Sequence, residues 1–293
     1  MSARSRGPAV HNDQMSADWG EKAPAWVRHE RIYDAAFAPF TRAVLSAAGI
    51  TDGLRVLDVG CGAGTLLEAS IAAGAEAVGV DISPLMAEAA RRRAPEARIV
   101  VADAQISDLL AEAPGRPFDR VISRFGVMFF ADPVAAFANL RSVTAPGGRL
   151  AFVCWRNGER DMFWHGLRSL VARLDPPPTQ PADDEPGPMG LAGGDRIRRV
   201  LTDAGWRDIV IEPMEKTADF SINGSDGVEE RLAVALAGRV GQAIRRELES
   251  RLGDAGWAEA LAEARAELRG RLVHGTVAFP ARAWLVTAAQ SDG

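Results

Sequence analysis

The chain has 293 residues, of which 47% are hydrophobic and 25% are charged, and its formal net charge at pH 7 is −5. This length suits one large α/β domain with additions, or two small domains. The acidic balance argues against a nucleic-acid partner, because phosphate binding calls for a basic face, and the two cysteines are too few for a disulfide framework or a cysteine-rich metal site.

The N-terminal stretch 1–15 carries polar and charged residues without an apolar centre. We expect a disordered tail there and not a secretory signal. No run in the chain approaches the roughly eighteen apolar residues that a membrane span needs. Together with the few cysteines, these features predict a cytoplasmic protein without a membrane partner.

The segment 16–50 is expected to be helical. The pattern runs from Pro24 to Ala48, with Pro24 suited to a first helical turn and Pro39 to a break or kink. One apolar stripe follows the helical spacing and consists of Trp26, Tyr33, Phe37, Phe40 and Val44. Such a stripe either packs against the core or belongs to a lid over a cofactor, in which case Trp26, His29 and Tyr33 face the cleft.

Residues 56–65 read VLDVGCGAGT, which predicts a strand, a tight turn and the start of a helix. Glycine allows a ligand to approach the backbone closely, and the free N–H groups of the helix point into the turn. Gly60 and Gly62 match the dinucleotide fingerprint, but the third glycine is Gly64, one position early. Asp58 would repel a pyrophosphate and suits a ligand with a positive charge.

Two acidic residues follow the next two predicted strands. The strand 76–82 contains Asp81 and Ile82 near its end, and the strand 98–102 is followed by Asp103 and Ala104. The Asp81 carboxylate is placed to accept hydrogen bonds from two ribose hydroxyls. Asp103 can accept from the exocyclic amine of adenine, while the Ala104 N–H donates to the ring. The alternatives are a helix cap for Asp81 and a surface turn for Asp103.

Two further strands complete a parallel core. They are expected at 119–125 and at 149–155, separated by a helix that starts at Asp132 and Pro133. Five strands thus alternate with four helices. That order predicts a parallel, doubly wound sheet with the ligand at the carboxyl ends of its strands.

The C-terminal half is expected to alternate helices with two late strands. A helix at 161–174 has His165 opposite its apolar stripe, and the proline-rich segment 175–194 is either a mobile surface loop or a substrate-facing flap. The remaining predicted elements are a helix at 195–204, a strand at 206–220, helices at 228–251 and 257–272, and a strand at 275–288 that Pro280 interrupts.

The pattern D-x-G-x-G-x-G, carried by Asp58, Gly60, Gly62 and Gly64, resembles motif I of the class I S-adenosylmethionine (SAM)-dependent methyltransferases. The stretch 56–155 resembles methyltransferases of the ubiquinone and menaquinone biosynthesis type. The elements that carry this likeness, in order, are VLDVGCGAGT, GVDIS, VADAQ, FDRVISRFGVMFFADP and LRSVTAPGGRLAFVCW.

The resemblance implies a Rossmann-like, doubly wound α/β fold. Its seven-stranded, mostly parallel sheet would have an antiparallel last strand, with the helices between the two late strands forming a cap. The SAM-binding core would span 51–156, and the stretch 157–293 would supply the cap and the last two strands.

The resemblance also implies SAM as the cofactor. Asp81 and Asp103 would hold the ribose and the adenine, and the backbone around Gly60, Cys61 and Gly62 would hold the methionine part. The backbone after strand four, at Ser123 and Arg124, would meet the methionine amine. Nucleic-acid and glutamine methylating relatives end strand four in an Asn/Asp-Pro-Pro-aromatic run. This chain has Ser123-Arg124-Phe125-Gly126 there, which argues against those substrates.

The predicted function is methyl transfer to an oxygen, nitrogen or carbon atom of a small molecule, by a monomer or a homodimer. If the acceptor needs a general base, the candidates are His29 and His165. No metal site is expected, since no two His or Cys residues have ligand-like spacing. The alternatives are an NAD-dependent oxidoreductase and a SAM-binding regulatory protein without turnover.

Overall fold

The computed structural model describes residues 13–157, 167–175 and 185–291. Within them, seven strands form one sheet in the order β3-β2-β1-β4-β5-β7-β6. β7 runs antiparallel to β5 and β6, and the pairs among β1 to β5 are parallel. The strands are β1 (Arg55–Val59), β2 (Glu76–Asp81), β3 (Arg98–Val101), β4 (Phe118–Arg124), β5 (Thr144–Trp155), β6 (Arg207–Asp219) and β7 (Ala278–Ala289). The predicted Rossmann-like α/β fold with an antiparallel last strand is confirmed.

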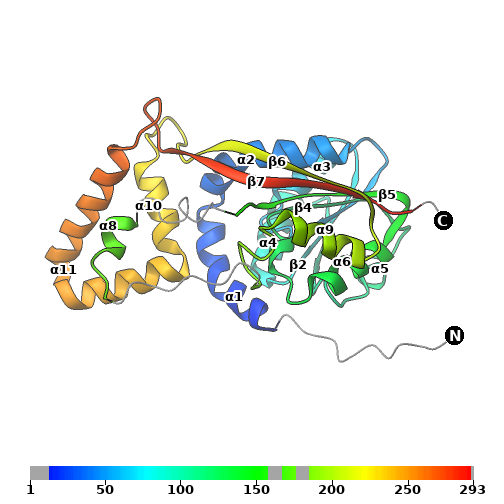
Figure 1. Cartoon of the computed structure of the whole chain (residues 1–293), viewed down its shortest axis with the longest axis horizontal. Coiled ribbons are helices and arrows are strands. Elements are labelled where there is room, and N and C mark those ends of the chain that lie inside the picture. Colours follow the sequence, from blue (N-terminus) through cyan, green and yellow to red (C-terminus); the bar gives the residue numbers. More distant parts are fainter. Residues whose placement is uncertain (1–12, 158–166, 176–184, 292–293) are drawn as a thin grey trace.

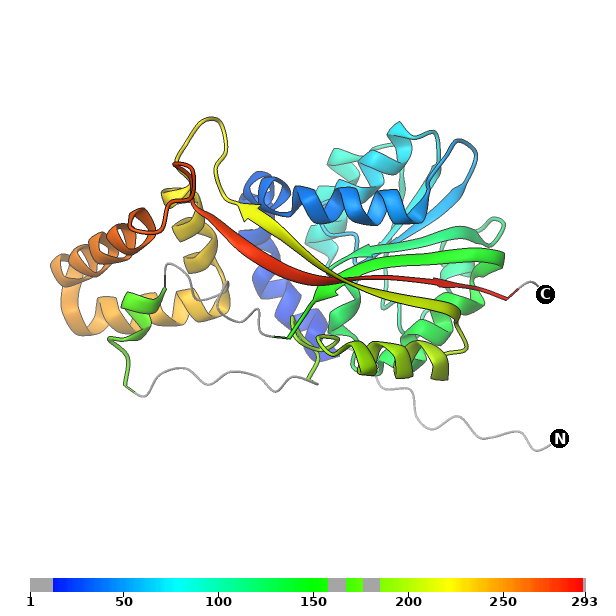
Figure 2. The same ribbon diagram turned by 45° about the horizontal axis from the view of Figure 1, so that its top comes forward.

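Helices cover both faces of the sheet. α2 and α3 lie on one face, and α6 and α9 on the other (Figure 2). Every residue of β1 is buried, as expected for a central parallel strand covered on both sides. The helices are α1 (Asp13–Arg28), α2 (Glu30–Ala48), α3 (Thr65–Ala72), α4 (Pro84–Arg93), α5 (Leu109–Glu112), the 3₁₀ turn η1 (Val127–Phe129), α6 (Pro133–Ser142), α8 (Arg168–Val171), α9 (Gly194–Asp203), α10 (Val228–Ala237) and α11 (Arg239–Arg269).

The N-terminal helices differ from the prediction. α1 begins at Asp13 and contains Pro24 in its interior, and Pro39 lies inside α2. The chain instead breaks at His29, whose φ of −110° and ψ of 19° are not helical. The rings of Trp26 and Tyr33 stack across this break, with centroids 3.7 Å apart. The break therefore lies at His29, between the two stacked rings, and not at either proline.

Two strands also differ from the prediction. β5 begins at Thr144, and the Pro146-Gly147-Gly148 turn is a bulge within it, because Phe118 pairs with Thr144 while Arg120 pairs with Arg149. β7 continues through Pro280, which lies beyond the last β5 pair at Trp155 and so has a neighbouring strand on one side only.

The two late helices are divided differently from the prediction. The expected helix 228–251 ends at Ala237, and Gly238 separates α10 from α11. The expected gap before 257 is only a kink in α11 at Gly253, which has a φ of 67° and a ψ of 179°. The part of the expected helix 161–174 that precedes residue 167 lies outside the described residues.

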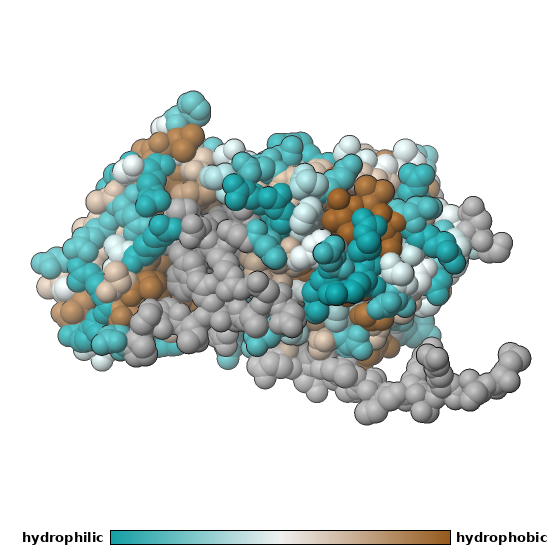
Figure 3. Space-filling model, in the orientation of Figure 1, coloured by the Kyte–Doolittle hydropathy of each residue, from teal (hydrophilic) through white to brown (hydrophobic). Residues whose placement is uncertain are grey.

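α8, α10 and α11 form a helical cap beyond the end of the sheet (Figure 1). α10 and α11 lie in the chain between β6 and β7, where the prediction placed the cap. Among the described residues, no helix is long and apolar enough to cross a membrane. Hydrophilic side chains are spread over both the cap and the sheet domain on the face seen in Figure 3, with apolar patches between them.

Candidate functional site

A cavity of about 520 Å³ lies at the carboxyl ends of the central strands. Its lining comes from the ends of β1 to β5 with the segments that follow them, from the N-terminal helices α1 and α2, and from the cap helix α10 with the start of α11. Leu167, Phe220 and four residues of the stretch 185–189 complete it. This volume lies within the range of about 300–1,000 Å³ that is typical of small-molecule sites. The carboxyl ends of parallel strands are also where α/β sheets bind their ligands.

The glycine turn brings bare backbone to the cavity wall. The N–H groups of Gly60 and Cys61 donate to the Val80 carbonyl at 2.9 and 3.1 Å, which ties the turn to the end of β2. Gly60 has a φ of 64°, and a Cβ on it would lie 2.9 Å from the Cα of Gly126. Only glycine therefore fits between β1 and the loop that follows β4.

Asp81 is held in a fixed orientation. One carboxylate oxygen accepts from the Gly62 N–H at 2.9 Å, and the other accepts from the Ser83 N–H at 2.9 Å. Burial raises the pKa of Asp81 to about 6, although the two backbone donors oppose the shift. A carboxylate has about four lone-pair sites, so each Asp81 oxygen retains acceptor capacity toward the cavity.

Asp58 is buried at the cavity wall, with 1% of its surface exposed. Its Oδ1 is buried and has no hydrogen-bond partner among the described residues. Burial raises the pKa of Asp58 to about 8, and the positive charge of Arg124 partly opposes this shift. A buried acceptor without a donor is costly unless a ligand supplies one.

Arg124, at the end of β4, also lines the cavity. Its Nη1 donates to Thr41 Oγ1 at 2.8 Å, and its Nη2 lies 3.7 Å from Asp34 Oδ1. Asp34 also accepts from the Thr65 hydroxyl at 2.7 Å and is paired with Arg93. This network joins α2 to the glycine turn and to β4, so the N-terminal helices are anchored at the site.

Hydrogen bonds within the loop after β3, and from α6, hold that loop in place. Asp103 Oδ1 accepts from the Gln105 N–H at 2.9 Å. The Asn139 amide donates to the carbonyls of Ala104 and Ser107, both at 2.9 Å. These bonds hold Asp103 and Ala104 at the cavity wall.

The cavity brings together ten of the thirteen predicted site residues. They are Asp58, Gly60, Cys61, Gly62, Asp81, Ile82, Asp103, Ala104, Trp26 and Tyr33. The N-terminal apolar stripe was expected either to pack against the core or to face the cavity, and the structure shows both. Trp26, Tyr33 and Phe37 line the cavity, whereas Phe40 and Val44 are fully buried in the core.

Three predicted residues are not part of the described lining. Ser123 is fully buried, and its hydroxyl donates to the Val59 carbonyl at 2.7 Å and accepts from the Gly126 N–H at 3.2 Å. It holds β1 and β4 together behind the site. His29 lies at the junction of α1 and α2, where partial burial and Arg28 lower its pKa, and is not among the lining residues. His165 lies outside the described residues.

Part of the cavity wall is aromatic. Phe125 stacks on Trp155, with ring centroids 3.9 Å apart and an interplanar angle of 15°. Phe125 has a φ of 62°, which a bulky residue adopts only when its surroundings enforce it. The sequence did not predict four side chains of the cavity lining, which are Arg124, Phe125, Trp155 and Arg231. The position of Phe125 at the end of the fourth strand could have indicated its role, but no local pattern pointed to Arg231.

Comparison with known proteins places this geometry in a family. Residues 56–148 match the family described as a methyltransferase domain. The ubiquinone biosynthesis O-methyltransferase of Bordetella bronchiseptica is 30% identical over 185 residues, which cover 62% of this chain and 76% of that protein. The aklanonic acid methyltransferase DauC of Streptomyces sp. is 35% identical over 130 residues, covering 42% of this chain and 58% of that protein.

A solved structure has the same fold. The phosphoethanolamine N-methyltransferase 2 of Haemonchus contortus in complex with S-adenosyl-L-methionine is 18% identical and has a TM-score of 0.52. The likeness covers 98% of this chain and 61% of that chain. At this identity the comparison supports the fold alone.

Proposed function

The chain belongs to the class I SAM-dependent methyltransferases of the ubiquinone and menaquinone biosynthesis type, and from this membership we propose that it transfers a methyl group from SAM to a small-molecule acceptor. The observation that carries the proposal is Asp58, a residue of the cavity lining whose buried Oδ1 has no donor among the described residues. A cationic ligand with N–H donors satisfies this atom and offsets the burial of its charge.

The lining residues fit the parts of SAM. Asp58 would hold the cationic amine, and the Arg124 guanidinium would hold the carboxylate, since both charges line the same cavity. The acceptor capacity left on Asp81 suits the two ribose hydroxyls. Asp103 and the Ala104 N–H suit the adenine, and the glycine turn leaves room for the methionine chain.

The chemistry asks little covalent work of the protein. When bound, SAM supplies a methyl group on a cationic sulfur, which passes to a nucleophile by in-line displacement. The chain's residues contribute by holding the reactants in line, and proximity can lower a barrier by about 7–11 kcal/mol. The aromatic walls formed by Phe125, Trp155, Trp26 and Tyr33 exclude water from the acceptor side.

The described lining residues include no histidine. Burial raises the pKa of Tyr33 to about 12, so its hydroxyl stays protonated at neutral pH and donates. This lining suits an acceptor that is already a nucleophile, such as an amine or an ionised acid. The names of the relatives, which are methyltransferases of aklanonic acid and of ubiquinone biosynthesis, support a small-molecule acceptor.

The proposal is tested in two steps with the full chain. Titration calorimetry with S-adenosylhomocysteine (SAH) should show binding, and the same titration with NADH should show none. Absence of SAH binding, or binding of NADH instead, would overturn the proposal and favour the oxidoreductase. SAM carrying a deuterated methyl group is then incubated with a metabolite extract, and labelled products are sought by mass spectrometry. SAH binding without any labelled product would favour the SAM-binding regulator.

A further inference from the structure

Asp34 on α2 links the N-terminal helices to the cavity without lining it. Its Oδ1 accepts from the Thr65 hydroxyl at 2.7 Å and lies 3.7 Å from Arg124 Nη2, and its Oδ2 is paired with Arg93. Thr65 and Arg124 belong to the cavity lining, whereas Asp34 is not among the described lining residues. The side chains of Asp34, Arg93 and Arg124 are 21%, 20% and 11% exposed, so water screens these charges only partly.

One face of α2 holds the Arg124 guanidinium. Asp34, Phe37 and Thr41 recur at helical spacing, which places them on the same side of the helix. The Arg124 Nη1 donates to Thr41 Oγ1 at 2.8 Å, and the guanidinium carbon lies 5.9 Å from the Phe37 ring centroid. Thr41 Oγ1 in turn donates to the Phe37 carbonyl at 3.3 Å. Because a guanidinium is planar, contacts at both of its Nη atoms fix its orientation.

The Thr65 hydroxyl transmits the position of Asp34 to Arg124. Besides donating to Asp34, it accepts from Arg93 Nη1 at 3.0 Å and from Arg124 Nη2 at 3.4 Å. A hydroxyl has one hydrogen and two lone pairs, and an ionised carboxylate can only accept. Asp34 therefore takes the hydroxyl hydrogen and turns the lone pairs toward the two arginines. Since Thr65 is the first residue of α3, this contact also ties α2 to the end of the glycine turn.

The charges of this cluster leave a positive charge for the cavity. Two arginines, Arg93 and Arg124, share the carboxylate of Asp34. Glu68 Oε2 also lies 3.3 Å from Arg93 Nε, but the Glu68 side chain is 60% exposed, so that ion pair is weak. Burial lowers the pKa of Arg124, the charge of Asp34 opposes this shift most, and the charge of Arg93 adds to it. Asp34 thus offsets the repulsion between the two arginines, and Arg124 remains able to bind an anion.

We propose that Asp34 is a positioning residue for the cofactor, which holds the Arg124 guanidinium in the orientation that binds the carboxylate of the methionine part of SAM. Asp34 acts through Thr65 and Arg124 and does not itself touch the cofactor. The inference rests on the proposed function, in which Arg124 binds that carboxylate. It extends the cofactor site to α2, which lies outside the stretch 56–148 that matches the methyltransferase domain.

The experiment compares two ligands that differ only in the carboxylate. Calorimetry with the full chain measures the affinity of SAH and of S-adenosyl-3-thiopropylamine, which is SAH without its carboxyl group. The wild type should bind SAH at least about tenfold more tightly, because a hydrogen bond to a charged group is worth that much. In Asp34→Asn, which removes the charge but keeps the shape of the side chain, this preference should fall about 3- to 10-fold through weaker binding of SAH alone. Asp34→Glu, which restores the charge, should keep part of the preference.

A double-variant cycle shows whether Asp34 acts through Arg124. Arg124→Met removes the group that binds the carboxylate, so it should abolish the preference for SAH. Adding Asp34→Asn to Arg124→Met should then change the preference no further, since the effects of coupled residues do not add. Glu21→Gln is the control, because Glu21 is an exposed acid on α1, and it should behave as the wild type. A further loss of preference in the double variant would contradict the inference.

A purely structural role of Asp34 predicts different results. If Asp34 only docked α2, its replacement would lower the unfolding temperature and weaken both ligands alike. Equal weakening of both ligands in folded Asp34→Asn, or an unchanged preference, would overturn the inference. If thermal unfolding shows that Asp34→Asn is not folded, Thr65→Val breaks the same link without removing a charge and should show the same loss of preference. A wild-type preference in Thr65→Val would then be the contrary result.

Failure of the proposed function gives a separate result. A wild type that binds neither ligand would mean that the proposed function fails. A wild type that binds both ligands equally would still bind a SAM-type cofactor, but its carboxylate would not meet Arg124, and the role of Asp34 would be wrong.

Discussion

Asp81 serves both the backbone and the cavity, and its replacement should show this. Asp81→Ala removes the acceptor of the Gly62 and Ser83 N–H groups together with the predicted ribose contacts. SAH affinity should fall by about 1–3 kcal/mol, as for an unsatisfied ligand donor, measured by calorimetry. Asp195→Ala, an exposed change on α9, is the control. Unchanged affinity in Asp81→Ala would show that the ribose binds elsewhere.

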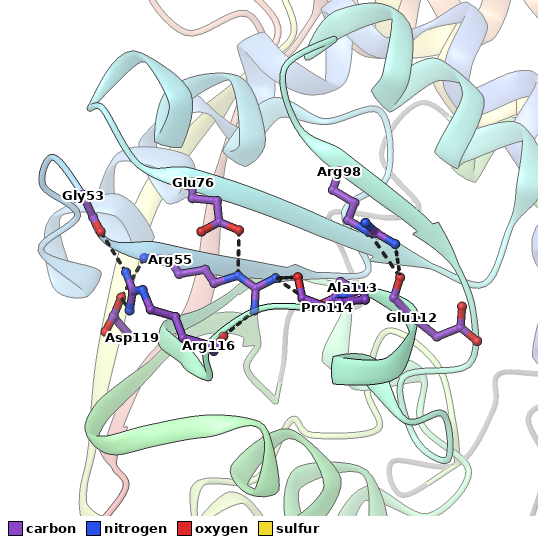
Figure 4. A network of polar contacts seen from close by, with 9 residues as sticks. All are labelled: Gly53, Arg55, Glu76, Arg98, Glu112, Ala113, Pro114, Arg116 and Asp119. Carbon is purple, nitrogen blue, oxygen red and sulfur yellow. Dashed lines mark hydrogen bonds and ion pairs between the residues drawn. The ribbon is translucent and has the colours of Figure 1, made fainter.

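Arg55 is a buried arginine with a structural role. It is 1% exposed, and its guanidinium carbon lies 4.6 Å from the Phe118 ring centroid. Figure 4 shows its polar contacts. Its Nε donates to Glu76 at 2.8 Å, but Glu76 is largely exposed, so this ion pair contributes little. The guanidinium also donates to the backbone carbonyls of Ala113, Pro114 and Arg116.

Arg55→Met should therefore destabilise the chain. Three carbonyls of the turn before β4 would lose their donor, and we expect the free energy of unfolding to fall by about 3 kcal/mol. Arg98→Met is a matched control in the same view, because Arg98 also donates to a carbonyl, that of Glu112, but is exposed (Figure 4). Urea unfolding of both variants checks the difference. Equal losses would mean that burial does not decide the effect.

At the scale of elements, the loop that follows β4 shapes the glycine turn. A Cβ on Gly126 would lie 2.5 Å from the Val59 carbonyl oxygen and 2.9 Å from Ser123 Oγ. The backbone of β1 cannot give way without moving the turn. The sequence predicted the turn from its own glycines, but nothing local indicated that Gly126 must be small.

Gly126→Ala should move the glycine turn out of place. We expect it to lower the free energy of unfolding by about 1–3 kcal/mol, as overpacking does, and to reduce SAH affinity about tenfold. Gly193→Ala serves as the control, because its Cβ would meet nothing nearer than Arg196 Cβ at 3.9 Å. Urea unfolding and calorimetry measure the two effects. Wild-type behaviour of Gly126→Ala would mean that the β1 and β4 ends are not rigidly joined.

The strands were more predictable than the helix boundaries. β1 and β2 are short apolar runs with turn residues on both sides, so the neighbouring residues predict where each strand begins and ends. The break between α1 and α2 lies at His29, between the stacked rings of Trp26 and Tyr33, where no proline or glycine marks it. The predicted helix start at Pro24 is therefore wrong, and Pro39 does not break α2, although the helical character was correct.

At the scale of the whole molecule, the two sides of the cavity differ in how far they were predictable. The strand ends carry Asp58, Asp81 and Asp103. Each of these residues lies in a short sequence motif that predicts its position at the end of a strand. The cap side depends on where α10 folds back, and Arg231 is an ordinary helical residue in the sequence. Patterns along the chain thus predicted the residues that line the strand-end side of the cavity, but not those that line the cap side.

The buried acids make the stability of the whole chain depend on pH. Burial raises the pKa of Asp58 to about 8 and of Asp81 to about 6, both above their ordinary value of 3.8. At a pH between 3.8 and the raised pKa, each of these carboxyl groups is protonated in the folded chain and ionised in the unfolded chain. The contribution of the two groups to stability is therefore complete below about pH 4 and is lost as the pH rises toward 8.

We expect the free energy of unfolding of the free chain to fall between pH 6 and 8 by up to about 1.4 kcal/mol per pH unit, the limit for one proton. Asp58→Asn should flatten this part of the curve, because the amide does not titrate.

SAH has a cationic amine that favours ionised Asp58. The affinity for SAH should therefore rise toward pH 8, and SAH binding should release protons. Urea unfolding across this range, and calorimetry in buffers of different ionisation enthalpy, measure both effects. A wild-type curve that matches that of Asp58→Asn, with no proton release on SAH binding, would mean that Asp58 is already ionised in the free chain and does not face the amine.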